Sequence, residues 1–358
     1  MSTNSGEKPT VRGRDRRRFD TSGGDIPGLF SMVRSGDLTR IRHIRCIRVE
    51  EWVSSGVSAE TMCIRLSRFN RDVIAAVMEA HAETYPWLRL CTVLEFGSGG
   101  RDEQVLGSDQ DNGLLMAVSP DADVLDECTQ SIVMALDGAG LPLCDGGVMM
   151  SLAQWRGRYD EWADRLMQWL ANPAEKGAWQ SGLILDFAAI PETDAAVELL
   201  RDRLWSFVQT KPLVISLLVQ ELMDYRLPLT FYGAFVTEKE GIWQGYLNIK
   251  KSVLAHLTNS VRILALKYSV VSSNTCERIR ALTRAGHVSA NHGVQLLEAW
   301  EYVQHKRFAI GLECARELLP PHNYVNPAYL DSEEKKQLKA SIHAVEKLVR
   351  LVQAGTWM

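Results

Sequence analysis

The stretch from Phe96 to Leu115, FGSGGRDEQVLGSDQDNGLL, constrains this chain more than any other part of it. An apolar run ends there in a Gly-Ser turn, and a second apolar run follows an Asp-Gln-Asp sequence. Because side chains alternate faces along a strand, we expect Asp109 and Asp111 on one side and Gln110 on the other. Two neighbouring carboxylates repel each other unless a cation lies between them, and Mg²⁺ prefers such oxygen ligands. The pattern therefore predicts a strand–turn–strand unit that carries a divalent-cation site.

The Gly-Ser turn adds a second kind of binding group. The backbone N–H groups after Gly97 and the hydroxyl of Ser98 suit a phosphate. A dinucleotide-binding fingerprint counted from Gly97 needs glycine where Asp102 stands, and a P-loop needs Gly-Lys at Asp102 and Glu103. A nucleophile elbow around Ser98 needs glycine in place of Phe96. With those motifs excluded, the turn and the Asp pair together describe a site for Mg²⁺ and a nucleoside triphosphate.

The same residues resemble a known family. The Gly-Ser turn followed by Asp-x-Asp is similar to the nucleotidyltransferase superfamily that includes polymerase beta and the aminoglycoside nucleotidyltransferases. The fuller run GSGGRDEQVLGSDQDN resembles a narrower bacterial group, related to the uridylyltransferase of the signal protein PII. Residues 245–282 and 296–308 are similar to the helical substrate-binding domain of that group. The resemblance implies an α+β fold, in which a small mixed-sheet nucleotidyltransferase domain flanked by helices precedes a C-terminal helical bundle.

Composition shifts and punctuating residues divide the chain into four segments. We expect a disordered basic leader over 1–25, a helical segment over 26–86, the nucleotidyltransferase domain over 87–194 and a helical substrate-binding domain over 195–358. A nucleic-acid arm is the other interpretation of the leader, but a solvated tail is favoured and nucleic acid is not expected as a partner. The basic residues of the leader that support either interpretation are Arg12, Arg14, Arg16, Arg17 and Arg18.

Hydrophobic periodicity predicts the elements around this site. One helix face and four further elements are expected: a face of Leu66, Phe69, Val73 and Val77, a helix over 123–137, a helix carrying Trp155, Trp162 and Trp169, a strand over 181–190, and a last helix with Leu338, Ile342, Val345, Val349 and Val352 on one face. The family resemblance implies a further strand over 141–150, because the run LPLCDGGVMM is similar to a strand of that group. The heptad-spaced tryptophans are interpreted as core residues, and a base-stacking platform is the alternative.

The resemblance assigns roles to individual residues. Asp109 and Asp111 would hold two Mg²⁺ ions for in-line transfer, while Gly97, Ser98 and Gly99 would hold the phosphates. Asp186 would supply the third catalytic carboxylate, and Asp145 is the other candidate for that role.

Three further residues complete the expected nucleotide-binding set. Arg101 either clamps a phosphate or pairs with Glu103 or Asp102 and fixes the turn. Gln104 is placed in the set by the family pattern, although a structural hydrogen bond near the site is the favoured interpretation of its side chain. Lys250 either reaches a phosphate or the acceptor, or is a solvated lysine at a helix start.

Two departures from the family pattern bear on activity. Ala188 stands where relatives have arginine, and Asn248 stands where they have aspartate. The expected function is transfer of UMP or AMP from an NTP to an acceptor hydroxyl, on a protein such as a PII-like regulator. The departures motivate an alternative, a catalytically weakened nucleotide-sensing or scaffold module. A small-molecule transferase of the aminoglycoside type is a third interpretation, which the longer motif disfavours.

Composition bears on membrane association, on metal sites other than the Asp pair and on the cellular compartment. No apolar run approaches the roughly 18 residues that a membrane-spanning helix needs, so no membrane association is expected. Seven cysteines lie scattered without C-x-x-C spacing, which is typical of reduced thiols in a cytoplasmic protein and gives no support to a zinc site. The oligomeric state is left open.

Overall fold

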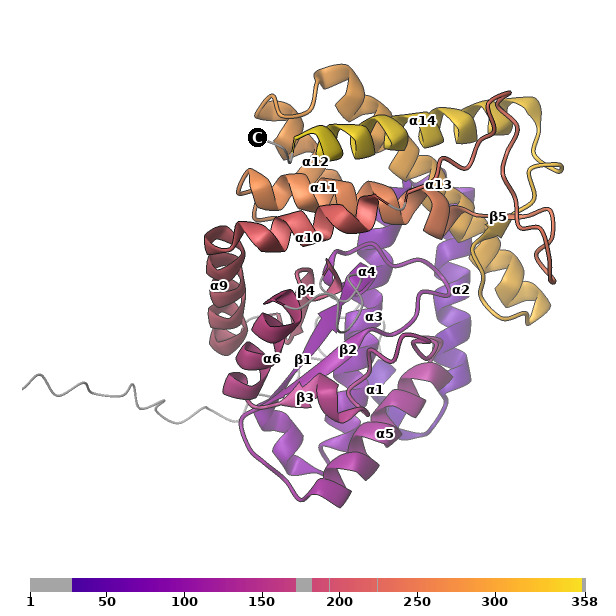
Figure 1. Ribbon diagram of the computed structural model, residues 1–358. Coiled ribbons are helices and arrows are strands. Elements are labelled where there is room, and N and C mark those ends of the chain that lie inside the picture. The colour runs from indigo at the N-terminus through magenta and orange to yellow at the C-terminus, as the bar shows by residue number, and fades with distance from the viewer. Residues whose placement is uncertain (1–27, 172–181, 193, 224, 356–358) are drawn as a thin grey trace, which may run out of the picture.

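The computed structural model describes residues 28–171, 182–192, 194–223 and 225–355 (Figure 1). The predicted leader over 1–25 lies outside these residues. Among the described helices, none combines the length and the apolar composition that crossing a bilayer requires.

A four-stranded mixed sheet forms the centre of the N-terminal part. Its strands lie in the order β3-β2-β1-β4. The strands are β1 (Cys91–Phe96), β2 (Asn112–Met116), β3 (Arg156–Gly157) and β4 (Phe187–Ile190). β1 pairs antiparallel with both neighbours, and β2 pairs parallel with β3. The α+β class and the small mixed sheet predicted from the sequence are confirmed.

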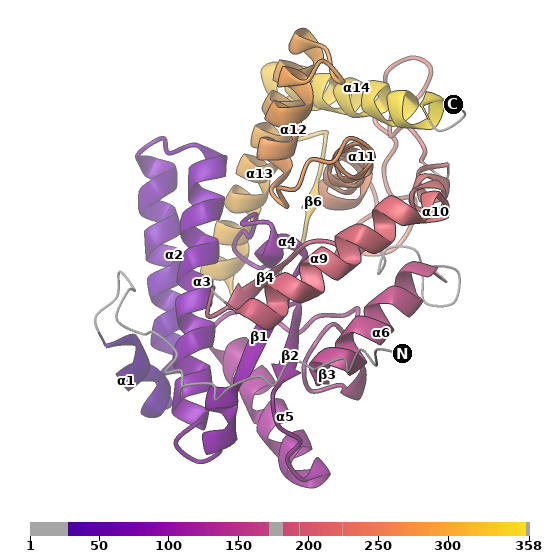
Figure 2. The same cartoon turned by 90° about the vertical axis from the view of Figure 1, so that its left-hand side faces the viewer.

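One face of the sheet packs on the helices that precede it and on the helix after β2. Val93 and Leu114, from β1 and β2, are fully buried on this side together with apolar residues of these helices. The predicted helix face of Leu66, Phe69, Val73 and Val77 lies in α3 and is buried. The helices on this side are α1 (Leu29–Arg34), α2 (Leu38–Ser54), α3 (Ala59–His81) and α5 (Ala122–Gly138) (Figure 2).

The opposite face packs on a tryptophan cluster and on helices α6 (Tyr159–Ala171) and α9 (Ala195–Thr210). The ring centroid of Phe96 lies 5.3 Å from that of Trp155 and 5.9 Å from that of Trp162. The core interpretation of the tryptophans is therefore confirmed. The single helix expected to carry them is wrong at its start, because Trp155 lies in the 3-10 turn η2 (Ala153–Trp155) and β3 separates it from α6.

The C-terminal part is helical and lies over one end of the sheet (Figures 1 and 2). The last helix presents the predicted apolar face to the core, where all five of its residues are buried. The elements are α10 (Pro212–Leu222), β5 (Leu247–Asn248), the π-helical turn η3 (Lys250–Leu254), α11 (Ala255–Lys267), α12 (Thr275–Arg284), α13 (Ala290–Glu317), β6 (Tyr324–Val325) and α14 (Ser332–Ala354).

Two expected strands differ in the structure. Residues 141–150 form a loop, since among the described backbone N–H groups of 110–112 only those of Gln110 and Asn112 donate to this segment, at Pro142 O and Val148 O, and no ladder forms. Within 181–190 only Phe187–Ile190 pairs with β1. Asp186 closes a turn by donating its N–H to Leu183 O, so it precedes the strand where the sequence placed it near the strand's end.

The aromatic cluster predicts a large effect of one substitution. Trp162→Ala removes a fully buried ring and its Nε1–H hydrogen bond to Leu114 O, so we expect the free energy of unfolding to fall by roughly 3–5 kcal/mol. Chemical denaturation measures the difference. Phe231→Ala is the matched control, because Phe231 is 97% exposed and its loss should change stability by less than about 0.5 kcal/mol. Equal effects of both variants would contradict the assigned core.

Candidate active site

Asp109 and Asp111 come together at the start of β2. One carboxylate oxygen from each lies within 4.8 Å of the other and of the Cys144 sulfur. Asp111 O accepts a 2.8 Å hydrogen bond from Phe96 N–H, which fixes it beside the end of β1. Gln110 turns the other way, where its amide donates to Val133 O and Leu141 O in the core. The predicted alternation of these three side chains is confirmed, although β2 itself begins one residue later.

Cys144 reaches this pair because its loop is fastened on both sides of Asp111. Gln110 N–H donates to Pro142 O, and Asn112 N–H donates to Val148 O, each at 2.9 Å. The residues between these two anchors form the loop that carries Cys144, and its thiol hydrogen-bonds the Asp111 carboxylate. The cysteine is 7% exposed.

The electrostatics of the pair favour binding of a cation. Burial and the neighbouring charge of Asp109 raise the pKa of Asp111 to about 7. Lys250 provides a positive charge beside the pair, since its Nζ lies 3.8 Å from Asp109 Oδ1 while both side chains stay partly exposed. Lys250, predicted from sequence to reach the site, is therefore placed beside it. One lysine offsets only part of the charge of two carboxylates.

The Gly-Ser turn forms α4 (Gly97–Gly100), a single helical turn directly after β1. Gly97 has φ +60°, and a Cβ there would lie 2.6 Å from Asp111 Oδ2. A Cβ at Gly99 would overlap the buried carboxylate of Glu95. Glycine is therefore required for this turn to approach the Asp pair so closely, and Ser98 lies between the two, half-buried.

Arg101 takes the second of its two predicted roles. Its Nε donates to Glu103 Oε2 at 2.8 Å, and its Nη1 lies 3.4 Å from Asp186 Oδ2. Glu103 in turn accepts from Thr275 N–H at the start of α12. Arg101 therefore fixes the turn and links it to the C-terminal helices.

Asp186 is fully buried among arginines. Its Oδ2 accepts from Arg262 of α11 at 2.7 Å, and its Oδ1 accepts from Arg278 of α12 at 2.7 Å. Burial alone would raise the pKa of Asp186, but Arg262, Arg278 and Arg101 hold it well below its usual range. Both oxygens are thus used by guanidinium groups, which corrects the expected catalytic role: the carboxylate anchors the structure, and it is not one of the three grouped donors.

Two family models match the chain. The model described as "Putative nucleotidyltransferase DUF294" matches residues 47–176, and the model described as "Putative nucleotidyltransferase substrate binding domain" matches residues 212–355. The chain belongs to this nucleotidyltransferase family. No curated protein matches it.

Two other expected site residues lie apart from the Asp pair of this nucleotidyltransferase. Gln104 is 2% exposed, and its side-chain oxygen accepts from Asn70 of α3 at 2.9 Å. The structural hydrogen-bonding role favoured for Gln104 is therefore confirmed, and its place in the nucleotide-binding set is corrected, because the amide oxygen is used inside the core. Asp145, the other candidate for a third carboxylate, is exposed and outside the donor group.

Sequence reasoning missed two buried residues of the site. Cys144 was seen only as part of an expected strand, and nothing local marks it as a neighbour of Asp111. Arg307 of α13 is 5% exposed and donates to the amide oxygens of Asn323 and Gln304. Burial lowers the pKa of Arg307 to about 10, while Asp109 lies near enough to raise it. Among the described residues Arg307 makes no ion pair.

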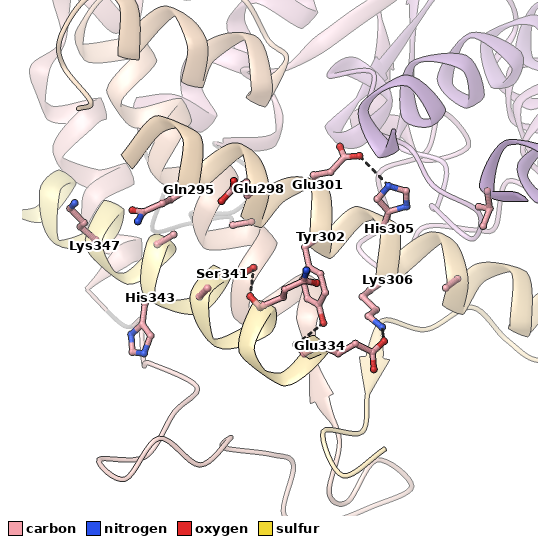
Figure 3. Close-up of a pocket in the computed structure, with 16 residues that line it drawn as sticks. Gln295, Glu298, Glu301, Tyr302, His305, Lys306, Glu334, Ser341, His343 and Lys347 are labelled. Carbon is pink, nitrogen blue, oxygen red and sulfur yellow. Dashed lines mark hydrogen bonds and ion pairs between the residues drawn. The ribbon is translucent and has the colours of Figure 1, made fainter. Parts of the chain in front are cut away.

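A cavity of about 1150 Å³ lies between α13 and α14, apart from this site (Figure 3). Its wall carries a hydrogen bond from Tyr302 to Glu334 O, an ion pair of Lys306 with Glu334, and a 3.1 Å contact between His305 and Glu301. None of its lining residues belongs to the expected nucleotide site. All of its lining residues except Val53 belong to the segment that matches the substrate-binding model.

The arginine cluster generates a prediction about stability and pH. Asp186→Asn leaves three buried guanidinium groups without their shared carboxylate, so the free energy of unfolding at pH 7 should fall by roughly 3–5 kcal/mol. Because the folded-state pKa of Asp186 is depressed, its contribution is present above the unfolded value of about 3.9 and is lost as the pH falls through the folded value.

The difference between wild type and Asp186→Asn should therefore shrink as the pH falls below about 4. Denaturant titrations at several pH values measure it. Asp202→Asn is the control, since Asp202 is exposed and its substitution should leave the curves superimposed. A difference that is constant across the pH range would contradict the assigned role.

Proposed function

We propose that this protein transfers UMP or AMP from an NTP to an acceptor hydroxyl, with divalent cations bound by Asp109 and Asp111. The observation that carries the proposal is the meeting of two carboxylates within 4.8 Å directly beside a glycine turn. This arrangement suits two ligands at once, a cation on the carboxylates and a phosphate on the turn.

The donor set fits the expected Mg²⁺. Asp109 and Asp111 offer hard oxygen ligands, and the side chain of Asp109 is 32% exposed, which leaves room for water and phosphate oxygens. When bound, the cations supply Lewis acidity, which lowers the pKa of the acceptor hydroxyl and offsets charge on the leaving pyrophosphate.

The residues of the chain itself orient the triphosphate. The turn of Gly97, Ser98 and Gly99 begins against Asp111, because a Cβ at Gly97 would lie 2.6 Å from Asp111 Oδ2, so phosphates bound on the turn are adjacent to the cation ligands. Lys250 provides a mobile positive charge at Asp109 and can exchange that contact for a phosphate oxygen. Arg101 and Asp186 act as positioning residues, because their charges are used in holding the turn against α11 and α12.

The acceptor contacts the C-terminal helices in this proposal. The cavity between α13 and α14 shares no lining residue with the Asp pair, so a molecule that fills it and also presents a hydroxyl at Asp109 must be large. That favours a protein acceptor, such as a PII-like regulator, over a small molecule.

One observation favours a second candidate, a nucleotide-sensing module with weakened catalysis. Within the described residues no third carboxylate joins Asp109 and Asp111. Asn248, which stands where relatives have aspartate, uses its side-chain oxygen to accept from Lys251 N–H. Tight NTP binding without transfer would select this candidate.

Nucleotidyl transfer should depend on Asp109. Incubation with each α-labelled NTP, Mg²⁺ and a cell lysate as acceptor source should label protein from one nucleotide, and Asp109→Asn should slow labelling by at least about 100-fold, because several kcal/mol of charge stabilisation are lost. The exposed Asp202→Asn serves as the matched control with unchanged rate. Undiminished labelling by Asp109→Asn would refute the assignment.

Nucleotide binding should depend on Lys250 and not on the adjacent Lys251. Lys250→Ala should weaken NTP binding by about 10- to 100-fold, the value of a charge-assisted hydrogen bond. Lys251→Ala should leave it unchanged, since Lys251 is exposed and no ion pair joins it to Asp109 among the described contacts. Equilibrium dialysis with labelled NTP measures both, and equal losses would show that Lys250 has no specific role.

A further inference from the structure

The proposed transfer reaction assigns no role to Cys144, although its sulfur lies beside both aspartates of the site. The thiol lies within 4.8 Å of an oxygen of each catalytic aspartate. Asp145, the next residue and the carboxylate that sequence reasoning considered, is exposed instead. The chain therefore brings sulfur, and not a third carboxylate, to the cation-binding face.

The position of the sulfur is set by the fold. The loop is fastened at Pro142 and Val148 to the residues on either side of Asp111. A further hydrogen bond closes the loop, from Gly147 N–H to Cys144 O at 2.9 Å, with Gly147 at φ +69°. Met150 N–H then donates to Asn112 Oδ1 at 2.9 Å. These bonds hold Cys144 over Asp111 and leave little freedom for its Cα.

The spacing of the three atoms suits a shared ion. Oxygen and sulfur ligands lie about 2.0–2.3 Å from a borderline divalent metal, so two ligands of one ion are at most about 4.5 Å apart. The three ligand atoms lie within 4.8 Å of one another, which is close to that limit. The partial exposure of Asp109 provides a path for the ion to enter.

The chemistry of the donors then decides which ion is preferred. Mg²⁺ takes oxygen ligands and gains nothing from sulfur, whereas Zn²⁺ and Cd²⁺ bind thiolate strongly. We propose that Cys144 is a direct metal ligand, and that it shifts the preference of the aspartate pair from Mg²⁺ toward thiophilic divalent cations. This inference rests on the proposed role of Asp109 and Asp111 as the cation site.

When the ion binds, it replaces the proton of the Cys144 thiol. A bond forms between the sulfur and the ion, the S–H bond breaks, and the proton passes to the solvent. No electron is transferred. A thiol that only positioned Asp111 by hydrogen bonding would keep its proton, so formation of the metal–sulfur bond separates the two roles.

Titration of the full-length protein with CdCl₂, followed by ultraviolet absorption, tests the proposal. Wild type should develop a sulfur-to-cadmium charge-transfer band that saturates at one equivalent. In Cys144→Ser the band should be absent and Cd²⁺ affinity should fall by at least the roughly 10- to 100-fold that loss of an outer-shell partner gives. Mg²⁺ affinity should stay within about threefold, because the serine keeps a hydrogen-bonding group of similar size. Circular dichroism verifies that the variant is folded.

Cys46→Ser is the matched control, since Cys46 is the half-buried cysteine and the other six are buried. Its band should equal that of wild type. The proposal is overturned if Cd²⁺ binds wild type without a charge-transfer band, or if the band persists in Cys144→Ser.

An aspartate variant and the labelling assay distinguish failure of the Cys144 ligand role from failure of the proposed transfer function. Should Asp111→Asn abolish Cd²⁺ binding while no sulfur band appears in wild type, the ligand role of Cys144 falls and the aspartate site stands. A sulfur band that depends on Cys144, combined with no transfer of any labelled NTP, supports the ligand role and contradicts the transfer reaction.

Discussion

The structure depends on one buried carboxylate shared by three arginines. Asp186 lies between the sheet and the C-terminal helices, and it binds Arg101 from the Gly-Ser turn, Arg262 from α11 and Arg278 from α12. A buried ion cluster of this kind contributes little net stability compared with apolar packing, but removing one member leaves the others uncompensated. The cluster therefore dictates the relative placement of the turn and the helices.

That placement has a direct consequence for the site. The start of α12 also donates from Ser273 to Gly100 O, from Asn274 to Arg101 O and from Thr275 N–H to Glu103. The turn that lies against Asp111 is thus held by the segment matching the substrate-binding model. Under the function proposed above, this arrangement would couple the part that contacts the acceptor to the part that orients the phosphates.

Features with a local period were predictable from the sequence. The alternation of Asp109, Gln110 and Asp111 and the apolar face of α3 follow from the repeat of a strand and of a helix, and both are confirmed. Contacts between distant segments had no such signal. The partners of Asp186 lie 76 to 92 residues away in sequence. Residues 141–150 were expected to form a strand, but only two backbone N–H groups of 110–112 donate to them, at Pro142 O and Val148 O, and the residues between these anchors form a loop.

The central claim is that Asp109 and Asp111 form the cation-dependent nucleotide site. Calorimetric titration of ATP, UTP, GTP and CTP, each with Mg²⁺, into wild type and into the Asp109→Ala/Asp111→Ala double variant tests it most directly. The account predicts that one nucleotide binds wild type and that the double variant loses this binding while remaining folded. Binding of the same nucleotide with equal affinity to both proteins, or of none to wild type, would contradict it.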